Sequence, residues 1–179
     1  MKRIYLVRHC KATGQEPDAQ LTDDGIQQAY QLAEFFKDMG IEYIVSSPFA
    51  RAIHTIKPLS DYSNREIHID DRLQERVLST AQLNNWMDLL EQTYSDFDLK
   101  FEGGESSNEA AGRALQVIKE MIERPEQNIV VVTHGALLSL IINQYDRAFG
   151  FEGWKRLTNP DVYKLEIEHH DARINRVWI

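Results

Sequence analysis

Two short runs of aliphatic and β-branched residues each lead directly into a histidine, and this pattern most constrains the fold. Residues 3–8 (RIYLVR) run into His9, and residues 128–133 (NIVVVT) run into His134. Runs of this length and composition are typical of buried strands. The sequence therefore predicts two core strands, each with a histidine just beyond its carboxyl end.

Helical patterns alternate with these strands. Apolar residues recur at helical spacing after Thr22, which suits an N-cap, and Gly40 closes that helix. Further strands are expected at 41–46, 67–69, 162–168 and 173–178, and further helices after Ser47-Pro48 and at 79–93, 106–124 and 135–148. This alternation favours a single α/β domain, residues 1–179, with a mostly parallel sheet. The weakly patterned residues 60–105 are expected to form a small helical cap.

The net charge and the cysteine content limit which binding partners and which cellular compartment we expect for this protein. The chain has 20 Lys and Arg against 28 Asp and Glu, a net charge of -8. Such a chain repels nucleic acids and anionic membranes, so we expect neither as a partner. The N-terminal apolar run is too short for a signal peptide, and the single cysteine, Cys10, is typical of a reducing compartment. We therefore expect a cytoplasmic protein, and the sequence indicates no particular oligomeric state.

Reactive side chains gather where the predicted strands end. Arg8 and His9 end the first strand, Arg51 follows the strand at 41–46, and His134 follows the strand at 128–133. Ligands of open α/β sheets bind at this edge. Two guanidinium groups suit the oxygens of a phosphate, one imidazole can attack phosphorus, and the other can stabilise developing charge. The pattern predicts phosphoryl transfer, and no spacing typical of metal ligands accompanies it.

Six motifs carry a resemblance to a known family and cover nearly the whole chain. They are LVRHC at 6–10, LTDDGIQQA at 21–29, SSPFARAIHT at 46–55, LQE at 73–75, GGES at 103–106 and VVTHG at 131–135. Together and in this order they resemble the histidine phosphatase superfamily, also called the phosphoglycerate-mutase-like family. The resemblance implies a three-layer α/β/α sandwich and an enzyme that uses no metal and no other cofactor.

The resemblance also implies roles for individual residues. His9 matches the nucleophile that becomes phosphohistidine, and Arg8, Arg51 and His134 match the residues that hold the phosphoryl oxygens. Glu75 matches the general acid that protonates the leaving oxygen and then activates water. In the family a Gly usually follows soon after this acid and is missing here, so Glu102 and Glu105 remain alternatives to Glu75.

The residues after the nucleophile depart from the family pattern. Cys10 stands where the family usually has Gly, beside the expected phosphate site. A small buried thiol is one interpretation, and a redox-sensitive thiol of lowered pKa is another. Many relatives have a phosphate-binding Asn in the following loop, which Thr13 or Gln15 could replace here. We include Cys10 and Gln15 among the substrate-binding residues.

The leading hypothesis is hydrolysis of a small phosphomonoester through phosphohistidine. A phosphoglycerate-mutase-type phosphotransferase is the alternative, although the short chain lacks the longer insertions and tail with which mutases enclose their substrate. A binding module without catalysis is a third hypothesis. Substrate specificity is expected from the cap and from loop 11–20, where Trp86, Tyr94, Phe97 and Phe101 either shape an apolar entrance or pack in the core.

Overall fold

The computed structural model describes residues 1–179, which form one six-stranded mixed sheet with helices on both faces. The strands are β1 (Lys2–Arg8), β2 (Tyr43–Ser46), β3 (Ile67–Ile69), β4 (Asn128–Thr133), β5 (Asp161–Glu168) and β6 (Asp171–Arg176). Their order across the sheet is β3-β2-β4-β1-β5-β6. The first four run parallel, whereas β5 is antiparallel to both of its neighbours.

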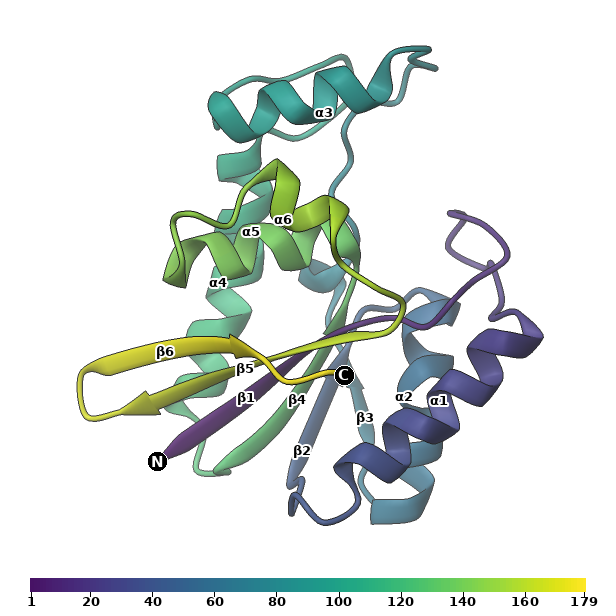
Figure 1. Ribbon diagram of the computed structural model, residues 1–179, viewed down its shortest axis with the longest axis vertical. Helices are drawn as coiled ribbons and strands as arrows, with labels where there is room; N and C mark the ends of the chain where they lie inside the picture. The colour runs from purple at the N-terminus through teal and green to yellow at the C-terminus, as the bar shows by residue number, and fades with distance from the viewer.

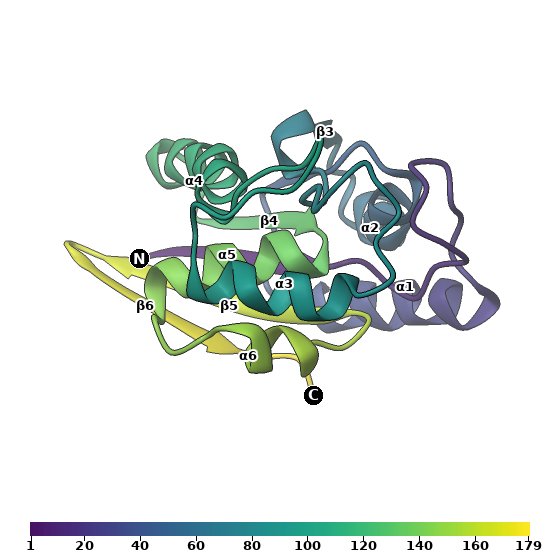
Figure 2. The same ribbon diagram turned by 90° about the horizontal axis from the view of Figure 1, so that it is seen from above.

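Two pairs of helices sandwich the sheet (Figure 1 and Figure 2). The helices are α1 (Asp23–Phe36), α2 (Ala50–Ser63), α3 (Trp86–Ser95), α4 (Ser107–Glu123), α5 (Gly135–Tyr145) and α6 (Phe151–Lys155). The helices α1 and α2 pack on one face, and α4 and α5 pack on the other. The three layers confirm the expected α/β/α sandwich. None of the helices is both long and apolar enough to cross a membrane.

Alternating side chains of the central strands divide the core in two. In β1, Ile4 and Leu6 join the cluster formed with α4 and α5. Tyr5 and Val7 point the other way and join the cluster formed with α1 and α2. Because successive residues of a strand face opposite sides, a strand covered by helices on both faces must be apolar at nearly every position. This explains the continuous apolar runs of β1 and β4.

Side-chain caps set the starts of two helices. Thr22 accepts a hydrogen bond from the Gly25 backbone at 3.0 Å, as expected for the N-cap of α1. Ser106 accepts one from the Glu109 backbone at 3.0 Å and starts α4 in the same way. The expected helix at Ser47-Pro48 begins later, at Ala50, because the chain is still extended at its N-cap.

The region expected to form the cap, 60–105, divides into two parts. Its first part belongs to the sandwich, since it contains the end of α2, β3 and a 3-10 turn at Asp71–Leu73. Its second part carries α3, which lies above α5 and α6 in Figure 1. We call residues 74–106 the cap. The helix expected at 79–93 starts only at Trp86, and α6 was not expected at all.

Two glycines explain why the cap residues before α3 are not helical. The segments 77–80 and 102–105 pair through backbone bonds from Thr80 N to Glu102 O and from Glu105 N to Val77 O, at 2.9 and 2.7 Å. A Cβ on Gly104 would lie 2.0 Å from the carbonyl oxygen of Leu78. The GGES motif therefore allows two backbones to meet closely, and this contact takes the place of the expected helical turn.

Candidate active site

The carboxyl ends of three parallel strands bring together the four residues predicted to converge. The strand β4 lies between β1 and β2, and Arg8 is paired with Thr133 in register. The rings of His9 and His134, the next residues along each strand, have centroids 5.2 Å apart. Arg51, in the first turn of α2, donates from Nε to His9 Nε2 at 3.2 Å. Cationic and imidazole groups thus share one edge of the sheet.

His9 is held as a neutral imidazole in one tautomer. Its Nδ1 lies 2.7 Å from the carbonyl oxygen of Cys10, which can only accept, so Nδ1 carries the hydrogen. The lone pair is then on Nε2. Burial lowers the pKa of His9 to about 4, and the charges of Arg51 and Arg8 act in the same direction, against the opposing bond to Cys10. His9 is therefore a neutral imidazole at neutral pH, and its Nε2 lone pair faces Arg51.

Arg51 is locked in place by the loop that precedes α1. Its side chain is 1% exposed, and Nη1 donates to the carbonyl oxygens of Gln15 and Glu16 at 3.1 and 2.9 Å. The guanidinium also lies 5.0 Å from the centre of the Phe49 ring. Burial lowers the pKa of Arg51, yet arginine remains charged in proteins. A fixed positive charge therefore faces His9.

Arg8 lies against the beginning of α5. Its Nη1 donates to the carbonyl oxygen of Leu157 at 3.0 Å, while its Nε is buried without a partner. A Cβ on Gly135 would lie 2.9 Å from that Nε, so glycine is needed for this close approach. Its Nη2 makes no hydrogen bond within the protein, and Arg8 lines the pocket described below, so this part of the guanidinium can bind an anion beside the positive end of α5.

His134 is a buried donor with its own fixed tautomer. Its Nε2 lies 2.8 Å from Ser47 Oγ, which itself accepts from the Phe49 backbone at 3.2 Å. When the Ser47 hydroxyl donates to Nε2, the ring hydrogen stands on Nδ1, a buried atom without a partner in the protein. Burial, followed by the positive charges nearby, lowers the pKa of His134 well below its usual value. A neutral N–H group is therefore available for an oxygen of a ligand.

Glu75 is fixed at the N-terminus of α5. Its carboxylate accepts backbone N–H bonds from Ala136 at 3.0 Å, Leu137 at 2.9 Å and Arg76 at 2.8 Å. Unpaired N–H groups at a helix start favour a negative group there. The carboxylate thus stands on the same helix end that Arg8 touches.

A pocket opens beside these groups, and Arg8 and Glu75 are the two of them that line it. It has a volume of about 440 Å³ and is lined by Arg8, Gln15, Glu75, Arg76, Leu78, Trp86, Leu90, Ala136 and Trp154. Gln15 contributes to this lining from an exposed loop position, and its backbone also holds Arg51; its role in substrate binding stays a prediction. The pocket size is within the usual range for small-molecule sites.

A sequence profile of the histidine phosphatase superfamily (branch 1) matches residues 4–179. The chain belongs to this superfamily. The match confirms the family and the phosphatase enzyme class that the ordered motifs predicted. The cluster at the strand ends is accordingly the candidate active site of a histidine phosphatase.

Two curated relatives illustrate the range of names within this superfamily. "Probable phosphoglycerate mutase GpmB" of Erwinia tasmaniensis is 26% identical over 80% of this chain and 74% of its own length. "Putative phosphoserine phosphatase 2" of Hydrogenobacter thermophilus is 29% identical over 79% of this chain and 77% of its own length. Relatives with similar sequence identity to this chain are therefore named both as a mutase and as a phosphatase.

Solved structures of histidine phosphatases share the fold. A phosphoserine phosphatase from Entamoeba histolytica, in complex with 3-phosphoglyceric acid, superimposes with a TM-score of 0.82 at 21% identity, over 100% of this chain and 98% of that one. A mycobacterial glucosyl-3-phosphoglycerate phosphatase gives 0.76 at 22% identity, over 98% and 97%. These likenesses confirm the α/β/α architecture.

The structure places the Cys10 side chain away from the phosphate-binding groups. Cys10 is fully buried in a small cluster with Leu21 and Ala29, and burial raises the pKa of its thiol to about 12. Its backbone serves the site instead, since its N–H donates to Thr55 Oγ1 at 2.8 Å and its carbonyl holds His9. A high thiol pKa opposes the redox interpretation, and we leave the thiol out of the proposed binding set.

The three candidate acids lie in different surroundings. Glu105 forms an ion pair with Arg113 at 2.7 Å and accepts from the Val77 backbone, so it joins the cap to α4. Burial alone would raise the pKa of Glu105, but the bonds from Arg113 lower it overall. Glu102 is exposed. Of the three, Glu75 alone lines the pocket, which favours it as the acid.

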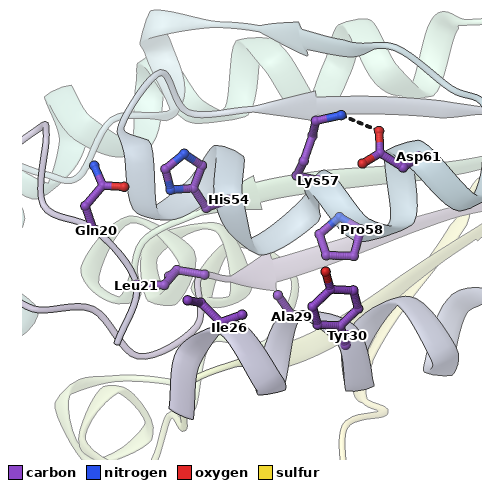
Figure 3. Close-up of a pocket in the computed structure, with 9 residues that line it drawn as sticks. All are labelled: Gln20, Leu21, Ile26, Ala29, Tyr30, His54, Lys57, Pro58 and Asp61. Carbon is purple, nitrogen blue, oxygen red and sulfur yellow. Dashed lines mark hydrogen bonds and ion pairs between the residues drawn. The ribbon is translucent and has the colours of Figure 1, made fainter. Parts of the chain in front are cut away.

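A second hollow, of about 410 Å³, lies between α1 and α2 (Figure 3). Its walls include Leu21, Tyr30, His54 and Pro58, and an ion pair of Lys57 with Asp61 lies at its edge. None of the converging strand-end residues lines it. We therefore assign the chemistry to the pocket at the strand ends.

Sequence reasoning missed three contributors to the site. Ser47 fixes His134, and Trp154 of α6 lines the pocket. Asn159 donates from Nδ2 to the His9 carbonyl oxygen at 2.9 Å across 150 positions of sequence. Ser47 lay within the quoted motif SSPFARAIHT and was detectable there. Trp154 and Asn159 lie in the segment between α5 and β5, where no local sequence pattern predicts a contact with the site.

Proposed function

We propose that this histidine phosphatase hydrolyses a small phosphomonoester through a phosphohistidine formed on His9, without a metal cofactor. One observation carries the proposal: the Nδ1 hydrogen of His9 is bound by Cys10, which leaves the Nε2 lone pair among two arginines. A neutral imidazole beside fixed cations suits attack on a phosphate dianion, because the cations balance charge that a metal would otherwise balance.

The first step forms a phosphorus–nitrogen bond. His9 Nε2 attacks phosphorus while the bond to the leaving oxygen breaks, and that oxygen takes a proton from the Glu75 carboxyl group. Arg8, Arg51 and the Nδ1 hydrogen of His134 bind the three other oxygens. The alcohol then leaves through the pocket.

The second step reverses these roles. Water attacks phosphorus, its proton passes to the Glu75 carboxylate, and the electron pair returns to His9 Nε2. Inorganic phosphate and the starting enzyme result. A relative named as a phosphoserine phosphatase supports hydrolysis, whereas one named as a phosphoglycerate mutase keeps phosphoryl transfer to a second alcohol as the alternative.

The test measures phosphate release from p-nitrophenyl phosphate in excess EDTA for wild type, His9→Ala and the exposed control His54→Ala. We expect turnover in wild type and control and none in His9→Ala. Rapid acid-free quenching should also trap one labelled phosphoryl group per chain, bound to His9. Turnover that requires added metal, or that survives His9→Ala, would contradict the proposal.

Two further outcomes point to the alternatives. Retention of label on the enzyme until a phosphorylatable alcohol is added would indicate a mutase-type transferase. Tight binding of phosphate by well-folded wild type, with no turnover of any ester in a panel of metabolites, would indicate a binding module.

A further inference from the structure

The pocket has two chemically different ends. Arg8, Gln15 and Glu75 line its polar end. Arg8 directly precedes His9 in the chain, and the Gln15 carbonyl holds Arg51, which bonds His9, so the phosphoryl group is placed at this end. Leu78, Trp86, Leu90 and Trp154 supply apolar walls, and they come from the cap and from α6. The leaving group of a bound phosphomonoester must extend along these apolar walls, because the catalytic groups occupy the other end.

An aromatic cluster fixes the apolar end in shape. The Trp154 ring stacks on Phe151 with centroids 5.5 Å apart and an interplanar angle of 20°. Phe151 in turn lies 6.0 Å from the ring of Tyr94 on α3. Trp86 meets Trp154 edge to face, with centroids 6.4 Å apart and planes at 90°. Two tryptophans from different parts of the chain thus contact each other and form one continuous aromatic wall of the pocket, in which Trp154 is the supported ring.

Trp86 also carries unused apolar surface. It is 46% exposed although it lines the pocket, whereas Leu90 beside it is 4% exposed. An exposed tryptophan at the edge of a pocket gains free energy when a ligand covers it. This surface is continuous with the walls that face the phosphate end.

The cationic side chains near the apolar end of the pocket already have hydrogen-bond or ion-pair partners within the protein. Arg76 donates through Nη1 to Thr93 and Ser107 and through Nη2 to the Glu105 carbonyl, at 3.1, 3.0 and 2.5 Å. Its remaining Nε has no partner but is covered by protein atoms, so it is not presented to a ligand. Lys155 lies with Nζ 5.1 Å from the Phe151 ring centre and pairs with Glu152. The one cation that lines the apolar end, Arg76, therefore already has its Nη groups engaged by the protein, which disfavours a second anionic group on the substrate.

From these observations we propose that the substrate is the phosphate monoester of an uncharged alcohol that carries an apolar ring, and that the ring packs against the contacting pair Trp86 and Trp154. The inference rests on the proposed function, because it assigns the leaving-group end of the same pocket. It gives Trp86, Trp154, Leu78 and Leu90 the role of specificity-determining residues.

The test compares kcat/KM for 2-phenylethyl phosphate, ethyl phosphate and phosphoserine. The first two are esters of unactivated primary alcohols, so their ratio reports mainly the ring. We expect 2-phenylethyl phosphate to exceed ethyl phosphate by about tenfold or more, as burial of a ring allows, and phosphoserine to be the poorest of the three. Trp154→Ala and Trp86→Ala should each reduce the ratio to about threefold or less.

Trp178→Leu is the matched control, since Trp178 packs on Phe35 far from this pocket. It should keep the wild-type ratio. Equal rates for the ethyl and 2-phenylethyl esters, or a preference for phosphoserine, would overturn the proposal. A wild-type ratio that survives both Trp86→Ala and Trp154→Ala would do the same.

Binding of inert phosphonates separates this inference from the proposed function. Quenching of tryptophan fluorescence by 2-phenylethylphosphonate and by ethylphosphonate measures affinity without turnover. Suppose that no ester is hydrolysed but the aryl phosphonate binds at least tenfold tighter than the ethyl compound, and that this difference depends on Trp154. The proposed hydrolysis is then contradicted, whereas the proposed ring site at Trp86 and Trp154 is supported. If esters are hydrolysed but the two phosphonates bind with equal affinity, the proposed ring site is contradicted and the proposed function is supported.

Discussion

Arg51 donates a hydrogen bond from Nε to the Nε2 atom of His9 at 3.2 Å. A guanidinium cannot accept a hydrogen, so this contact is compatible only with a lone pair on Nε2. The same arginine is anchored at Nη1 by the carbonyl oxygens of Gln15 and Glu16. One side chain therefore orders the loop over the site and keeps the proposed nucleophile unprotonated.

Replacing Arg51 by lysine should impair catalysis although the charge is kept. A lysine ammonium is a point charge and cannot span the loop carbonyls and His9 together. We expect kcat to fall by roughly 10²- to 10³-fold, as for loss of an oxyanion donor. Steady-state kinetics of Arg51→Lys against Arg65→Lys, whose side chain is exposed, would check this. A fall of less than about fivefold would argue that the fork geometry is unimportant.

Changing Glu75 to glutamine should harm esters of poor leaving groups most. A glutamine still accepts from the α5 backbone but cannot deliver a proton to the leaving oxygen. We expect kcat/KM to fall by roughly 10²- to 10⁴-fold for an alkyl phosphate, and much less for p-nitrophenyl phosphate, whose leaving group needs no acid. Glu102→Gln serves as the control. Equal losses on both substrates would assign the acid to another residue.

Acidification should destabilise the protein through His9. The unfolded chain binds this proton near pH 6.5, whereas folded His9 binds it only near pH 4. The unfolded state therefore holds more protons between these values, and the free energy of unfolding falls as pH is lowered through that window. From pH 7 to 4.5 the contribution is about 2 to 3 kcal/mol.

Urea unfolding at both pH values measures this effect. His9→Ala should show a smaller fall than wild type by that amount, while His54→Ala should resemble wild type. An NMR titration of the His9 ring would give the midpoint directly. A midpoint near 6.5 would contradict the assigned neutral, buried state.

Asn159 should act as a positioning residue for the nucleophile. Its Nδ2 donates to the carbonyl oxygen of His9 at 2.9 Å, and the adjacent Leu157 carbonyl receives Arg8. We expect Asn159→Ala to cost about 1 kcal/mol of unfolding free energy. It should lower kcat by about tenfold, since small displacements of reacting groups are costly.

A split between kcat and KM distinguishes positioning from mere stabilisation. Loss of position should appear in kcat with KM nearly constant at a temperature where the variant is fully folded. Asn175→Ala, at an exposed position of β6, should change neither constant. Wild-type kcat in folded Asn159→Ala would rule the role out.

The thiol of Cys10 should be inert in the native protein. Burial raises its pKa to about 12, and the side chain is fully covered. We expect no reaction with Ellman's reagent until urea unfolds the chain, and no loss of activity in millimolar peroxide. Rapid labelling of the folded protein would instead revive the redox interpretation.

The convergence of Arg8, His9, Arg51 and His134 was predictable because each follows a strand or starts a helix at a position that local patterns define. The carboxyl ends of neighbouring parallel strands lie at the same edge of the sheet, independently of the conformation of the loops. Asn159 and Trp154 were not predictable, because they reach the site through tertiary packing of the segment after α5. The late start of α3 had the same kind of cause.

The GGES contact shows this physical reason in detail. The expected helix included residues 79 and 80, but backbone groups of segment 77–80 bond to 102–105, more than twenty positions away. Local propensity is a weak prior that such long-range bonds override. Only the glycines at 103 and 104 hinted that two backbones would meet there.

The paired segments 77–80 and 102–105 close the cap on itself, and the ion pair of Glu105 with Arg113 joins the cap to α4. Leu78, Trp86 and Leu90 belong to the cap, whereas the hydrogen bonds that orient His9 come from residues outside it. Glu75 also lies within the cap range, but the backbone of α5 holds its carboxylate. Substitutions at the apolar cap residues should therefore change which alcohol is accepted while the groups proposed to transfer the phosphoryl group keep their positions. New substrates can be acquired in this way by remodelling a few cap residues.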